Sequence, residues 1–200
     1  SDIPVPTAYI PGLVGGGGGG GGAVTVSYTG PDVAIPDNTP AGVNINVPVS
    51  GVGTISDLNF SIDQVAGGTC DGTVGDVDCG INHSWVGDII LKITSPGGTT
   101  VTVIDRVGTP PGTVGCSNNN FALITLNDDG GLPPIESQAN PGPTCTSSLK
   151  FPSGNFSPNN AMSAFDGQNA DGTWVVNISD NAGGDTGTAR AFSLIFNSGN

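Results

Sequence analysis

The stretch Leu58-Asn-Phe-Ser-Ile-Asp63 alternates apolar and polar residues, so Leu58, Phe60 and Ile62 share one face of an extended chain. A period of two is typical of a strand with one buried face. Seven other segments show a comparable pattern, and each is bounded by Gly, Pro, Asn or Asp. They are residues 23–28, 43–49, 88–93, 100–105, 121–126, 173–179 and 191–196. About eight short strands predict an all-β fold, either a two-sheet sandwich or a jelly roll.

The composition favours the same fold class. Val, Ile and Thr, which pack well on pleated sheets, number 53 of the 200 residues, whereas Leu, Glu, Lys, Met and Gln together number 15. Gly and Pro contribute 34 and 16 residues. These residues favour turns, and a chain with many short strands needs many turns.

The charge excludes several classes of partner. Seventeen acidic and four basic residues give a formal net charge of −13. A nucleic acid or an anionic membrane would be repelled over most of such a surface. No apolar run approaches the roughly 18 residues that a membrane span requires. We therefore expect neither nucleic-acid binding nor membrane insertion.

The four cysteines indicate disulfide bridges. Cys70, Cys79, Cys116 and Cys145 show no Cys-x-x-Cys spacing and no histidine pairing of the kind that builds a zinc site. Their even number favours an oxidising environment, so we expect a secreted protein, either extracellular or at the cell surface. Three pairings are possible. We favour 70–79 and 116–145, because each bridge would then close one loop rich in Gly, Pro or Asn.

The chain divides into three zones at a run of eight glycines. Residues 1–14 are apolar and punctuated by proline, which favours an extended tail. Residues 15–22 are all glycine, and the β domain follows over 23–200. A polyglycine segment reads most simply as a flexible linker.

The tail also suggests a mode of self-assembly. Val5, Thr7 and Tyr9 alternate, and Ile10 follows them, as in a strand. Such a strand could add to the open sheet edge of a neighbouring copy. A head-to-tail contact of this kind that does not close into a ring grows into a filament. We therefore expect a homopolymer that assembles through the N-terminal strand.

Several motifs in the C-terminal half occur in a recognisable order. They are His83-Ser-Trp-Val-Gly-Asp88-Ile-Ile-Leu, Thr94-Ser-Pro-Gly-Gly-Thr99, Val103-Ile-Asp-Arg106, Ala164-Phe-Asp-Gly-Gln-Asn-Ala-Asp-Gly-Thr-Trp174, Asn177-Ile-Ser-Asp180 and Asp185-Thr-Gly-Thr188. Over roughly residues 32–197 the chain resembles the P domain (P/Homo B domain) that follows the catalytic domain in proprotein convertases and in secreted bacterial subtilisin-like proteases. The resemblance implies a jelly-roll β-sandwich. It also implies an alternative function, that of an accessory domain which stabilises or targets a subtilisin-like catalytic domain.

The sequence argues against catalysis by this chain. No subtilisin-like catalytic domain is present, and residues 1–31 have no counterpart in the P-domain pattern. His83 is the only histidine, so a Ser–His–Asp triad would have to use it. Its neighbour Ser84 would point to the opposite face of a strand. The resemblance implies a structural role for His83 at the head of a strand.

Calcium is the expected cofactor. Loops rich in Asp, Asn and Gly supply the carboxylate and carbonyl oxygens that calcium prefers, although such residues also form solvated turns without a metal. The P-domain resemblance implies that several of these loops lie together. The ligands that it implies for one structural calcium are Asp57, Asp88, Asp128, Asp180 and Asp185.

The sequence leaves three functions open. The first is a non-catalytic structural subunit of an extracellular filament, and the second is the accessory domain of a protease. The third is a carbohydrate-binding module that uses Trp85. However, Trp85 and Trp174 both fall in segments of strand character, which favours core positions for them.

Overall fold

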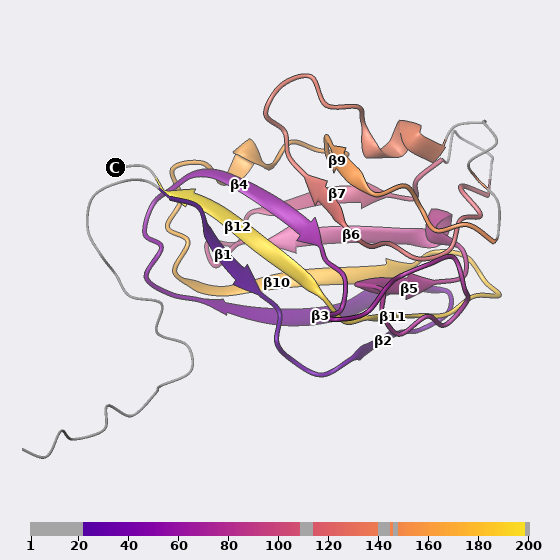
Figure 1. Ribbon diagram of the computed structural model, residues 1–200. Coiled ribbons are helices and arrows are strands. Elements are labelled where there is room, and N and C mark those ends of the chain that lie inside the picture. Colours follow the sequence, from indigo (N-terminus) through magenta and orange to yellow (C-terminus); the bar gives the residue numbers. More distant parts are fainter. Residues whose placement is uncertain (1–21, 109–113, 140–144, 146–147, 199–200) are drawn as a thin grey trace, which may run out of the picture.

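The structure is a computed structural model that describes residues 22–108, 114–139, 145 and 148–198 (Figure 1). The predicted tail over 1–14, with Val5, Thr7, Tyr9 and Ile10, lies outside the described residues, as does all of the glycine run except Gly22. No helix within the described part of the chain is long and apolar enough to cross a membrane.

Three β-sheets form the fold. The first has the strand order β1-β12-β4-β8-β9. Its strands are β1 (Val24–Ser27), β12 (Phe192–Ser198), β4 (Ile55–Ile62), β8 (Ile124–Leu126) and β9 (Gly154–Phe156). The second has the order β3-β10-β6-β7. Its strands are β3 (Thr39–Val49), β10 (Gly172–Asp180), β6 (Ile89–Thr94) and β7 (Thr100–Asp105).

The third sheet is small and has the order β2-β11-β5. Its strands are β2 (Val33–Ile35), β11 (Gly187–Ala189) and β5 (Ile81–His83). All described strand pairs are antiparallel except β8 and β9, which run parallel. Three short 3-10 turns complete the described elements: η1 (Val86–Asp88), η2 (Ile135–Ala139) and η3 (Met162–Phe165).

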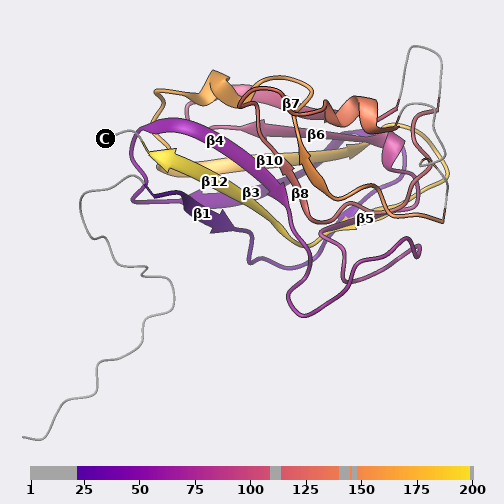
Figure 2. The same cartoon turned by 45° about the horizontal axis from the view of Figure 1, so that its top comes forward.

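The two larger sheets pack face to face as a sandwich, in agreement with the predicted all-β class. Figure 1 shows β1, β12 and β4 lying across β3, β10 and β6, and Figure 2 shows the same strands turned by 45° about the horizontal axis. Trp174 of β10 is fully buried between them. Its ring centroid lies 5.1 Å from that of Phe165 and 5.4 Å from that of Phe196 on β12, both edge to face. The indole therefore joins the two sheets.

Each of the eight predicted strands has a counterpart in the structure. Leu58, Phe60 and Ile62 are fully buried, as their alternation predicts. Among the described residues there are twelve strands rather than about eight. The four additional ones are β2, β5, β9 and β11, each of three residues. β8 is equally short, but it belongs to the longer apolar segment 121–126, whereas three residues alone are too few for a period of two to stand out from the surrounding loop.

The described cysteines form the two predicted bridges, Cys70–Cys79 and Cys116–Cys145. The position of Trp85 differs from the expectation. It lies outside the strands and is half-exposed, and its indole N–H donates to the carbonyl of Val114 at 2.8 Å. The reason is local, because the chain turns through η1 before β6 begins.

Candidate functional site

A buried group of charged residues lies at the end of the sandwich where β10 ends and β6 begins. Asp180, the last residue of β10, pairs with Ile89, the first residue of β6. His83 ends β5 and pairs with Gly187 of β11. Asp88 closes η1 immediately before β6. Strand pairing therefore brings His83, Asp88 and Asp180 to one place, although they come from distant parts of the chain.

His83 is held on both sides of its ring. It is 1% exposed, and its Nε2 lies 3.1 Å from Oδ2 of Asp180, which is fully buried. Its Nδ1 lies 2.8 Å from the carbonyl oxygen of Trp85. The backbone amide of Trp85 also donates to Nδ1, at 3.2 Å. Neither ring nitrogen is therefore free to take a proton from an attacking hydroxyl group.

Asp88 shares this site with the opposite charge of Arg106. The Nη2 of Arg106 lies 3.4 Å from Oδ1 of Asp88, and its Nε donates to the carbonyl of Gly87 at 3.2 Å. Burial is the main reason that the pKa of Asp88 is raised, and the charge of Asp180 adds to it. His83 and Arg106 act in the other direction. The guanidinium of Arg106 therefore compensates a carboxylate that is otherwise costly to bury.

The loop after β10 closes the site. Ser84 donates its hydroxyl hydrogen to Oδ1 of Asp185, and the amide of Ala182 donates to Oδ1 of Asp180 at 3.1 Å. Asn181 binds the carbonyl of Asp88 twice, through its backbone amide at 2.9 Å and its Nδ2 at 3.2 Å. The contacts of Ser84 and Asn181 each join two segments that are distant in the sequence. The arrangement is therefore an internal cross-link between the β5–β6 and β10–β11 connections.

The other two predicted calcium ligands lie elsewhere. The amide of Ile55, the first residue of β4, donates to the carbonyl of Gln168, shortly before β10 begins. Asp57 on β4 is therefore near the start of β10, whereas Asp180 is at its end. Nine residues of strand separate these points by about 26 Å at the usual rise per residue. The five acids are thus divided between the two ends of the sandwich.

Acidic residues gather at this second end without a base. Asp57 accepts from Asn59 Nδ2 at 3.0 Å and from Asn197 Nδ2 at 2.6 Å. Asp128 accepts from the amide of Ser163 at 2.9 Å. Burial raises the pKa of nearby Asp166, and the charges of Asp57, Asp128 and Asp129 raise it further. Repulsion between these carboxylates therefore adds to the effect of burial.

The carboxylates of the described residues are too far apart for a ready-made calcium site. No three Asp, Glu or His side chains in this part of the chain bring one ligand atom each within 4.8 Å of one another. The one group that meets this distance is Cys70, Asp76 and Cys79, in which the two sulfur atoms are joined to each other. Calcium binding stays a prediction, and the five acids do not form one coordination sphere.

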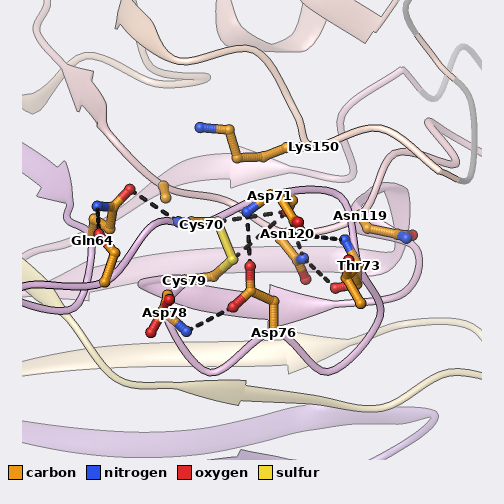
Figure 3. Close-up of a disulfide and its surroundings, with 12 residues drawn as sticks. Gln64, Cys70, Asp71, Thr73, Asp76, Asp78, Cys79, Asn119, Asn120 and Lys150 are labelled. Carbon is orange, nitrogen blue, oxygen red and sulfur yellow. Dashed lines mark hydrogen bonds between the residues drawn. A yellow bond between two sulfur atoms is a disulfide. The ribbon is translucent and has the colours of Figure 1, made fainter.

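In the acidic loop between Cys70 and Cys79, the carboxylates accept hydrogen bonds from backbone amides of the same loop (Figure 3). Asp76 accepts from the amides of Asp71 at 2.7 Å and Asp78 at 2.9 Å. Asp71 accepts from the amide of Thr73 at 2.6 Å. These are turn-stabilising contacts of the Asx type. Hydrogen bonds from Thr73 accordingly lower the pKa of Asp71.

Two buried asparagines attach this loop to the sandwich. Asn120 accepts from the amide of His83 at 3.1 Å and donates to the carbonyls of Asp71 at 3.0 Å and Thr73 at 2.8 Å. Asn119 donates to the carbonyl of Gly72 at 2.7 Å. A Cβ atom at Gly72 would lie 2.3 Å from the carbonyl oxygen of Ser148, so only glycine permits this close approach.

Several of these residues lack a signal in the sequence. Arg106 ends one of the motifs that resemble the P domain, but nothing in that motif indicates its contact with Asp88, and Asn119 and Asn120 belong to an asparagine run that is typical of a polar loop. Their roles depend on neighbours far away in the chain, since Asn120 binds residues that precede it by 37 to 49 positions. Asn118, Asn119 and Asn120 differ from the asparagines of an ordinary polar loop in that they are fully buried.

Comparison with known proteins gives structural matches and no sequence family. No family model and no curated protein matches the chain. The structure is similar to the crystal structure of a serine protease of Aeromonas sobria, with 13% identity over 89% of this chain and 26% of that chain and a TM-score of 0.46. It is also similar to a structure of the Aeromonas sobria serine protease in complex with a chaperone, with 14% identity over 90% of this chain and 26% of that chain and a TM-score of 0.47. The chain thus spans about a quarter of the length of these proteins.

Proposed function

We propose that this chain is a non-catalytic accessory domain of the P-domain type, which stabilises or positions a secreted subtilisin-like catalytic domain. One observation carries the proposal. The motifs on which the P-domain resemblance rests lie about 100 residues apart, yet they contact each other through His83 with Asp180 and through Ser84 with Asp185. Motifs that build one buried cross-link are better explained by a shared fold than by chance.

The state of His83 supports the non-catalytic part of the proposal. It is the single histidine of the chain, it is 1% exposed, and both ring nitrogens lie against oxygen atoms. A histidine that acts as general base needs a nitrogen within reach of a nucleophile. The neighbouring Ser84 donates to Asp185 instead. The two disulfides support export to an oxidising compartment.

The natural secreted protein provides the test. It is purified without chelators and treated with a fluorophosphonate probe, which labels the reactive serine of serine hydrolases, and its peptides are identified by mass spectrometry. We expect this chain together with a labelled subtilisin-like domain, either in the same polypeptide or in a stable complex. A purified protein without any such domain contradicts the proposal.

A second candidate function is strand-mediated self-assembly, and the edge strand β1 favours it. Among the described strands, β1 pairs only with β12, so its other edge is open. Val24 on this strand is 38% exposed. Between residues 26–30 and residues 46–48 of β3 there is a groove of about 270 Å³. An open edge beside a groove suits the addition of a strand from another chain.

Electron microscopy separates the two functions. Full-length protein is compared with a variant that lacks residues 1–14, after both have been shown to fold. Filaments from the full-length protein alone support assembly through the tail. Dispersed single particles from both proteins contradict it and leave the accessory-domain function.

A further inference from the structure

A second groove, of about 560 Å³, lies on the side of the sandwich where β1 ends. One wall comes from the connection between β1 and β2, with Tyr28 and Asp32. The opposite wall comes from the chain that leaves β4, with Asp63 and Val65, and from the Cys70–Cys79 loop, with Val77. A volume of this size is within the range of clefts that bind small ligands or single side chains.

The apolar part of the groove is held in place. The ring of Tyr28 stacks on Phe192, with 4.8 Å between the ring centroids and 5° between their planes. The Tyr28 hydroxyl donates to the carbonyl of Pro31 at 2.7 Å. Val77 is 62% exposed at the rim. The groove therefore offers a fixed aromatic ring and an aliphatic contact to whatever enters it.

The charge of the groove is negative. Arg190 also lines it, but its Nε donates to Oδ2 of Asp32 at 2.9 Å, so these two charges compensate each other. Asp63 accepts from the hydroxyls of Ser61 and Ser193. No base of the described chain forms an ion pair with Asp63. Its carboxylate is therefore oriented by two neutral donors.

We propose that this groove binds the cationic side chain of a lysine or arginine on an extended, basic polypeptide segment. The ammonium or guanidinium group would meet Asp63, and the aliphatic part of the side chain would lie along Tyr28 and Val65. A carboxylate beside an aromatic ring is suited to a cation with an apolar stem. The net charge of −13 attracts a basic segment over a long range and repels an acidic one. This proposal does not depend on whether the chain is an accessory domain or assembles with copies of itself.

Nuclear magnetic resonance on the full-length protein tests the proposal with a defined probe. The probe is a blocked pentapeptide, Gly-Lys-Val-Lys-Gly, and its twin carries Nε-acetyllysine at both lysine positions. We expect the lysine peptide at about 10 mM to shift the amide signals of Tyr28, Asp63 and Val65, and the acetylated twin to leave them in place. Equal shifts from both peptides, shifts confined to other regions, or no shift at all would each overturn the proposal.

Two matched variants locate the charge that is responsible. Asp63→Asn removes one charge and keeps an acceptor oxygen for one of the two serine hydroxyls, while its amide nitrogen can donate to the other hydroxyl oxygen. Asp129→Asn removes one charge at the opposite end of the sandwich. Both variants are first compared with the wild type by thermal unfolding. Affinity for the lysine peptide is expected to fall at least about fivefold in Asp63→Asn and less than about twofold in Asp129→Asn. Equal losses in both variants would show a general effect of net charge and overturn the assignment to this groove.

Discussion

Aspartates lie together at both ends of the sandwich, but their surroundings differ. At the His83 end, Asp88 and Asp180 are buried and face His83 and Arg106. At the other end, Asp57 and Asp128 accept only from amide groups, and Asp166 lies among other acids. The first arrangement is a structural cross-link, whereas the second is a site of repulsion.

The difference shows why acidic composition alone does not locate a metal site. The chain has only four bases, and Arg106 is placed where burial makes a compensating charge most valuable. The acids at the second end are partly or fully exposed, so water screens them in part and leaving them without a base costs less. The net charge of the protein therefore does not show that its aspartates lie in two environments with different energetics. Predictions about single carboxylates have to begin with their neighbours.

The largest effect is expected at the buried end. Asp180→Ala leaves His83 without its carboxylate partner and removes the acceptor for the Ala182 amide. Loss of one partner of a buried ion pair typically costs about 3–5 kcal/mol. We expect the midpoint of thermal unfolding to fall by roughly 10 °C. Asp180→Asn, which keeps an acceptor oxygen, should lose less, and a loss no larger than in Asp129→Asn would contradict the cross-link.

The only glutamate should make stability depend on pH. Burial raises the pKa of Glu136 from 4.5 to about 7, although its Oε1 accepts from the Asp105 amide at 2.7 Å. The folded state therefore binds the proton more tightly, and the free energy of unfolding should fall as the pH rises from about 4.5 to about 7.

Glu136→Gln should remove this dependence. The variant keeps the acceptor for the Asp105 amide, so we expect it to be more stable than the wild type at pH 8 by at most about 3 kcal/mol. Below about pH 4.5 the two proteins should unfold together. Urea unfolding at pH 4, 6 and 8 measures the difference. A constant difference across this range would mean that Glu136 titrates normally.

The Cys70–Cys79 bridge should contribute less than the buried ion pair. The double substitution Cys70→Ser and Cys79→Ser opens a loop with a sequence separation of 9. The chain-entropy estimate for such a loop is about 2–3 kcal/mol. The loop should stay attached through Asn119 and Asn120, so hydrogen exchange at Thr73 should rise only modestly. Complete loss of folding would show that the hydrogen bonds depend on the bridge.

The smallest effect is expected from calcium at the acidic end. A divalent cation near Asp57, Asp128 and Asp166 would relieve the repulsion that raises the pKa of Asp166. We expect calcium to raise the midpoint of thermal unfolding by about 2 °C and a chelator to reverse the change. Asp57→Asn should abolish the response, and Asp88→Asn should leave it intact. An unchanged midpoint in the wild type would argue against the predicted calcium.

The amino-acid sequence was enough to predict the fold class, eight of the twelve described strands and the pairing of the cysteines. Alternation as in Leu58, Phe60 and Ile62 is a local signal, and burial on one face follows directly from it. The same local reasoning missed β2, β5, β9 and β11. Strands of three residues derive their stability from pairing with distant segments, and a window of sequence does not contain those segments.

Which acidic side chains come together depends on the tertiary structure. The sequence grouped Asp57, Asp88, Asp128, Asp180 and Asp185 into one predicted metal site, whereas strand pairing places Asp57 and Asp128 at the end opposite to Asp180. Electrostatic interactions fall off within about 10 Å in solution. The chemistry of a carboxylate therefore depends on register and burial. The pattern of residues along the chain does not contain that information.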